Sequence, residues 1–72
     1  MAQPTFNSNK VARELCEKFG LQQCVILGFS DAKGYEIVAA GANEQDAQIA
    51  TEVAVGLKEG LTQTGTPIKL VV

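Results

Sequence analysis

The sequence predicts an α+β fold with the element order helix, strand, strand, helix, strand, in which the helices pack on one face of a small antiparallel sheet. Two segments, residues 11–19 and 47–61, carry apolar residues at helical spacing. Between them, two β-branched runs flank a cluster of turn residues, and a third such run ends the sequence. Seventy-two residues are enough for one domain, so we expect a single domain over residues 7–72 that follows a flexible arm at residues 1–6.

The first helix is predicted to begin after Asn7 or Ser8, whose short polar side chains can accept hydrogen bonds from the free N–H groups of a first turn. Pro4 lacks a backbone donor and lies in the aperiodic arm. Gly20 follows the last periodic residue and suits a left-handed helix end. The apolar face consists of Val11, Ala12, Leu15, Cys16 and Phe19.

A hairpin is predicted next. Residues 24–29 form a nearly continuous apolar run, which is typical of a buried strand. Residues 30–34 contain Asp31 and Gly34, which favour a turn, and residues 35–40 form the returning strand.

The second helix is expected within residues 41–60, with Asn43 as its N-cap and Glu44 and Asp46 in its first turn, where negative charge suits the helix dipole. Its apolar face is broad and rich in small residues, which allow close approach of another helix. We expect this face to contact a second copy of the chain, the alternative being packing within the chain alone. The predicted interface residues are Ala47, Ala50, Val53, Ala54, Gly56 and Leu57.

The last strand is predicted at residues 67–72, after a polar loop. Two locations for it remain open: the edge of the chain's own hairpin, or the sheet edge of a neighbouring subunit.

Composition excludes several classes of function. The net charge is −2 and the six Lys and Arg residues are scattered, so we expect no duplex nucleic acid as a partner. No apolar run is long enough to span a bilayer and the first residues lack signal-peptide features, so we expect a cytoplasmic protein without a membrane partner.

Cys16 and Cys24 then suit reduced core positions. Without any His, and without an acid–base pair of convincing spacing, the sequence predicts no enzyme, no metal site and no cofactor.

The candidate ligand site is the start of the first helix together with two loops. The start of the second helix is set aside, because Glu44 and Asp46 would repel an anion there. Free N–H groups and positive side chains at a helix start can hold a phosphate or carboxylate, although an ordinary capped helix would have the same sequence. Turn and loop residues could clasp the same ligand, although such residues are usually only solvated. The predicted ligand-binding residues are Thr5, Asn7, Ser8, Asn9, Lys10, Arg13, Lys33, Tyr35, Thr62 and Thr64.

The order and spacing of several residues resemble a group of short, uncharacterised α+β proteins encoded by bacteriophages and prophages. The similarity covers most of the chain. It involves residues 13–18, Gly20 and Gln23 with residues 25–26, then Asp31 and Gly34 in the hairpin turn. In the second helix it involves Gly41, the capping position 43, Asp46, Ala50, Glu52, Leu57 and Lys58.

The resemblance implies a host-cell context, in which small accessory phage proteins bind or sequester host components. With the residues above, it leads us to expect a non-enzymatic, homo-oligomeric module for a small anionic ligand, in particular a nucleotide. A sharper form is an anti-defence sponge that sequesters a host defence signal. The alternative is a protein–protein interaction module that inhibits or adapts a host protein through a sheet edge.

Overall fold

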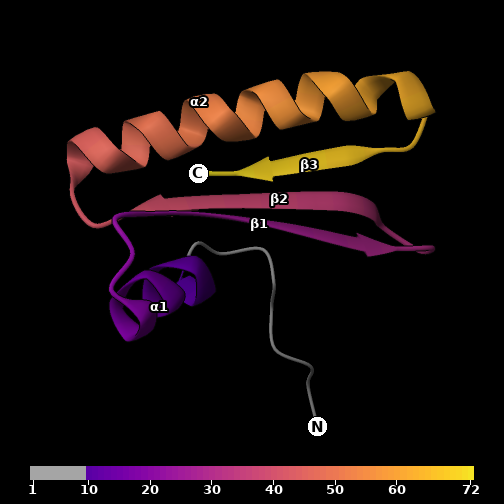
Figure 1. Ribbon diagram of the computed structural model, residues 1–72. Coiled ribbons are helices and arrows are strands. Elements are labelled where there is room, and N and C mark those ends of the chain that lie inside the picture. The colour runs from indigo at the N-terminus through magenta and orange to yellow at the C-terminus, as the bar shows by residue number, and fades with distance from the viewer. Residues whose placement is uncertain (1–9) are drawn as a thin grey trace, which may run out of the picture.

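The computed structural model describes residues 10–72 and contains two long helices and three strands (Figure 1). The predicted arm at residues 1–6 and the predicted caps Asn7 and Ser8 lie outside the described residues. Among residues 10–72, no helix combines the length and the apolar character that crossing a bilayer requires. The elements are α1 (Lys10–Phe19), β1 (Gln23–Ser30), β2 (Gly34–Gly41), α2 (Glu44–Leu61), the short 3-10 helix Thr62–Thr64 and β3 (Ile68–Val71).

The predicted α+β class and element order are confirmed, but the sheet is mixed instead of antiparallel. Its strand order is β1-β2-β3. β1 pairs antiparallel with β2, from Gln23↔Gly41 to Ser30↔Gly34. β3 pairs parallel with β2, from Tyr35↔Ile68 to Val38↔Val71. The antiparallel prediction was wrong for β3 because α2 carries the chain back along the whole sheet, so that β3 begins at the end where β2 begins.

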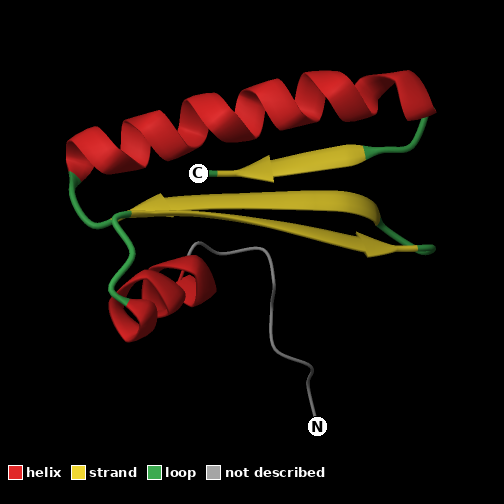
Figure 2. Cartoon of the chain, viewed as in Figure 1, coloured by secondary structure: helices red, strands yellow, loops and turns green. Residues whose placement is uncertain are grey.

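The two helices cover opposite faces of the sheet, which corrects the prediction that they share one face (Figure 2). Ile37 and Ala39 of β2 pack in one cluster with α2. Val38 and Ala40 of the same strand pack in a second cluster with Ala12 of α1. Successive side chains of a strand point to opposite faces. An apolar run on the central strand therefore needs a helix on each side.

α2 packs closely on the sheet because its inward positions are alanines. Ala50 and Ala54 are 1% and 0% exposed and contact the cluster of Ile37 and Ala39, and Leu57 packs against the same cluster. The prediction that Ala50 and Ala54 face a second copy is therefore wrong, since the chain's own sheet covers them. Leu57 is only partly buried, so its predicted contact with a second copy stays a prediction. Val53 and Gly56, by contrast, lie on the exposed part of the helix.

The junction between β2 and α2 is fixed by a hydrogen-bonded cap. Asn43 is the N-cap, as predicted: its Oδ1 accepts from the Asp46 N–H at 2.8 Å, and its Nδ2 donates to Asp46 Oδ2 at 3.0 Å. Gln23 of β1 donates through Nε2 to Asp46 Oδ1 at 3.0 Å. A Cβ added to Gly41 would overlap the backbone of Asp46 and Ala47. The first turn of α2 thus lies directly against the end of β2.

We predict that Gly41→Ala lowers the free energy of unfolding by more than about 2 kcal/mol, because the new methyl group would collide with backbone that cannot move aside. The matched control is Gly60→Ala, where a Cβ meets nothing within 4 Å and the helix gains up to about 1 kcal/mol. Urea denaturation followed by circular dichroism measures both changes. Equal midpoints for Gly41→Ala and the wild type would contradict the close contact at this junction.

Candidate functional site

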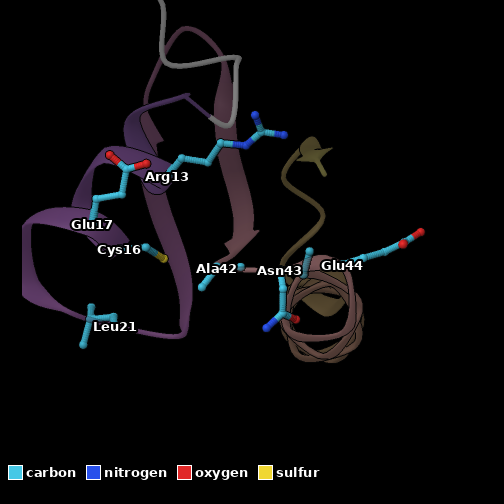
Figure 3. A pocket seen from close by; sticks show the side chains of 9 residues that line it. Arg13, Cys16, Glu17, Leu21, Ala42, Asn43 and Glu44 are labelled. Atoms are coloured by element: carbon cyan, nitrogen blue, oxygen red, sulfur yellow. The ribbon is translucent and has the colours of Figure 1, made fainter.

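The larger of the two cavities described here lies between α1 and the junction of β2 with α2, with a volume of about 550 Å³. Figure 3 shows its side chains, which come from two segments far apart in the sequence. The lining residues are Arg13, Cys16, Glu17, Leu21, Gly41, Ala42, Asn43, Glu44 and Ala47.

The backbone brings these two segments together. On α1, Arg13, Cys16 and Glu17 are spaced three and four residues apart and therefore share one side of the helix. The chain leaves α1 through a tight turn, in which the Leu21 N–H donates to the Cys16 carbonyl at 2.8 Å. Opposite, the Ala42 N–H donates to the Gln22 carbonyl at 2.9 Å, which holds the start of α2 beside the end of α1.

The cavity has one cationic side chain and a mixed wall. Arg13 is the only Lys or Arg among its lining residues, while Glu17 and Glu44 carry carboxylates. In Figure 3 the Arg13 guanidinium points away from the Glu17 carboxylate, and the Glu44 carboxylate points away from the cavity. Leu21, Ala42 and Ala47 supply apolar surface. The arrangement can offer a guanidinium to an anionic group and an apolar wall to the rest of a ligand.

Cys16 is a buried residue at the wall of the cavity. Burial raises the pKa of its thiol above the ordinary value of 9.0, and the neighbouring Cys24 adds to the rise. Both cysteines are free, as predicted. A thiol that stays protonated at neutral pH is a poor nucleophile and a poor metal ligand.

A smaller hollow of about 330 Å³ lies where α2 ends and β3 begins, and the predicted loop residues are close to it. Thr62 lines this hollow, but its Oγ1 donates to the Lys58 carbonyl at 2.9 Å. Thr64 Oγ1 likewise donates to the Leu61 carbonyl at 2.8 Å. The two hydroxyl hydrogens therefore satisfy carbonyls at the end of α2 and are not free for a ligand.

The hairpin turn lies at this same end of the sheet. The Tyr35 N–H donates to the Pro67 carbonyl at 2.9 Å. The Tyr35 ring packs against the Phe29 ring, with the two ring centroids 4.9 Å apart. The Lys33 N–H donates to Ser30 Oγ at 3.1 Å within the turn.

The structure therefore divides the predicted ligand site. Arg13 lines the large cavity, whereas Lys33, Tyr35, Thr62 and Thr64 lie at the other end of the sheet. Lys10 is an exposed residue at the start of α1 and does not line the cavity. The predicted residues Thr5, Asn7, Ser8 and Asn9 lie outside the described residues.

The sequence interpretation missed Cys16, Leu21, Ala42 and Asn43 as cavity residues. It set aside the start of α2 because Glu44 and Asp46 would repel an anion. In the structure, the two Asp46 oxygens accept hydrogen bonds from Gln23 and Asn43, and Glu44 points outward. The signal that could have located this wall is Gly41, two residues before the cap Asn43, because a glycine there permits close packing of β2 and α2.

Among residues 10–72, no group of three His, Cys, Asp or Glu side chains is placed to hold a metal ion. Comparison with protein-family models, with curated proteins and with solved structures gives no match.

We predict that the unfolding free energy falls as the pH rises from 8 to 10, and that part of this fall comes from Cys16. Because the folded state raises the pKa of this thiol, its contribution is complete below the unfolded value near 9.0 and is lost as the pH approaches the higher folded value. Urea denaturation at pH 7, 8.5 and 10 measures the slope. Cys16→Ala should have a shallower slope than the wild type despite its lower stability at pH 7, and an identical slope would contradict the assignment.

Proposed function

We propose that this protein is a non-enzymatic, self-associating module that binds a small anionic ligand of the nucleotide class in the cavity between α1 and the start of α2. The observation that carries the proposal is that Arg13, a residue with a cationic side chain, lines a cavity of about 550 Å³. This volume lies within the ~300–1,000 Å³ range of small-molecule sites.

The wall chemistry fits the two parts of a nucleotide. A guanidinium pairs with phosphate oxygens through two parallel hydrogen bonds. Leu21 and Ala42 provide an apolar surface against which a base or sugar can pack. Glu17 lies one turn from Arg13 on the same helix, so its carboxylate would repel a compact, highly charged anion. A ligand that carries neutral hydrogen-bonding groups beside its negative charge is therefore favoured.

The proposal is non-enzymatic because the nucleophilic atom of the cavity is not activated. Burial keeps the Cys16 thiol protonated at neutral pH. The sequence has no His that could act as its base. The resemblance to phage-encoded proteins supports sequestration of a host nucleotide as the purpose of binding.

We predict that a nucleotide raises the melting temperature of the wild type and that Arg13→Ala removes most of this rise. At ten times its Kd, a ligand stabilises the fold by about 1.4 kcal/mol, which corresponds to a rise of several degrees for a chain of this size. Losing the hydrogen bonds to a charged phosphate should weaken binding about tenfold or more. Thermal unfolding with mono-, di- and cyclic nucleotides measures the effect.

Lys33→Ala is the matched control, because it removes one positive charge at the other end of the sheet and should leave the rise unchanged. Equal losses in the two variants would indicate a general charge effect and not a site at Arg13. A flat response of the wild type to every nucleotide would contradict the proposed ligand class.

A further inference from the structure

β1 is a free sheet edge without the features that normally protect one. It pairs with β2 on one side only, and among residues 10–72 no strand lies on its other side. Its eight residues, QCVILGFS, contain no charge and no proline. Its register with β2 is continuous over all eight pairs, so no bulge interrupts it. Natural edge strands are usually short, charged, bulged or proline-containing, because an open edge pairs with other chains.

The other edge of the same sheet has this protection. β3 has only four residues, follows Pro67 and carries Lys69. The difference between the two edges marks β1 as the edge available to a partner.

Beside the β1 edge, four apolar side chains are exposed on the α2 face of the sheet. Leu27 and Phe29 of β1 are 45% and 59% exposed. Ile49 and Val53 of α2 are 39% and 55% exposed. We call Leu27, Phe29, Ile49 and Val53 the β1 flank.

The side of α2 that faces β1 is fixed by a hydrogen bond. Gln23 of β1 bonds to Asp46, so Asp46 lies on the β1 side of the helix. Ile49, Val53 and Gly56 follow Asp46 at intervals of three, four and three residues, which keeps them on that side.

The backbone determines how a further strand can pair with β1. The Ala42 N–H donates to the Gln22 carbonyl, so this opposed pair is hydrogen-bonded. Opposed pairs in an antiparallel ladder alternate between bonded and non-bonded. The even-numbered residues of β1 therefore bond to β2, and the odd-numbered residues direct their N–H and C=O groups to the free edge. The Tyr35 N–H, which bonds to Pro67 on the β3 side of β2, shows the same alternation from the other side of that strand.

We propose that a second copy of this chain occupies the edge, with the two β1 strands paired antiparallel about a two-fold axis. Only odd-numbered residues present free groups, so odd residues of one copy must oppose odd residues of the other. Opposed residues share a face of the sheet. Both β1 flanks and both α2 helices then lie on one face of a sheet that joins the three strands of each copy.

A copy suits this edge because the surface is complementary to itself. With the axis at Leu27, each Leu27 opposes its counterpart, and Val25 opposes Phe29 of the second copy. β1 contains no charged residue, so pairing two β1 strands brings no like charges together within the strands, although each chain has a net charge of −2.

The two α2 helices are matched along their length in this arrangement. α2 rises about 1.5 Å per residue and β1 about 3.3 Å, so α2, with 18 residues, and β1, with eight, have nearly equal lengths. Leu27 then lies near the level of Val53, which places Val53 beside the axis and Ile49 within about one residue of the level of Gly56 of the second copy. The two β2 strands lie about 14 Å apart, and the β1 flanks fill the space between the helices.

This inference specifies the self-associating part of the proposed function and does not depend on the ligand. We predict that light scattering without ligand gives the mass of a dimer at micromolar concentration, and that Leu27→Lys shifts it to a monomer by weakening association at least tenfold. Leu27 is already half exposed, so the lysine is accommodated in the single chain. Val72→Lys is the matched control, because Val72 is 61% exposed and lies outside the β1 flank; its mass should stay that of a dimer.

Gly56→Leu separately tests the proposed packing of the β1 flank of one copy beside Gly56 of the other. A Cβ at Gly56 meets nothing within 4 Å in one chain, so the variant should fold but dimerise less tightly. Circular dichroism confirms folding of each variant.

A dimer that persists in both Leu27→Lys and Gly56→Leu would overturn the β1 interface while leaving self-association intact. A monomeric wild type would overturn both, and the nucleotide titration would still test the ligand independently. A complex containing a different protein in place of the second copy would also overturn the inference.

Discussion

The burial of β2 on both faces is the constraint on which the rest of the structure depends. Alternate residues of this strand belong to two separate hydrophobic clusters, with Ile37 and Ala39 beneath α2 and Val38 and Ala40 above α1. Neither helix can cover both sets, because successive strand side chains point in opposite directions. The central strand therefore determines the three-layer arrangement and leaves the two outer strands as edges.

The small size of the chain explains why one of these edges remains apolar. A domain of 72 residues buries a modest fraction of its surface, and its α2 helix contacts the sheet mainly through Ala50 and Ala54. Such small side chains bring the helix close but cover little area beyond β2. Leu27 and Phe29 on β1 consequently stay exposed. The proposed pairing with a second copy would bury these two side chains.

The sequence predicted α1, α2 and the three strands, because each has a clear local signal: helical spacing, β-branched runs, the Gly34 turn and the Asn43 cap. The short 3-10 helix Thr62–Thr64 lies where a loop was predicted. The predictions that both helices cover one face and that β3 is antiparallel were wrong. Helical spacing identifies the buried side of Ala50 and Ala54 but not the partner that buries it, and small residues suit a sheet as well as a second helix. Strand direction depends on where α2 ends in space, which no local pattern contains.

The candidate site illustrates the same limit. Arg13 was identified from its charge at the start of a helix, but its neighbours in the cavity come from residues 41–47, which only the folded chain brings near. The start of α2 was set aside as an anion site because of its two acidic residues, although the Asp46 carboxylate accepts hydrogen bonds from Gln23 and Asn43. The hydrogen bond from Gln23 to Asp46 links the two proposals. It holds the start of α2 where that segment forms one wall of the cavity, and it turns Ile49 and Val53 toward the free edge of β1. The proposed ligand site and the proposed dimer interface therefore lie on different surfaces that depend on the same orientation of one helix.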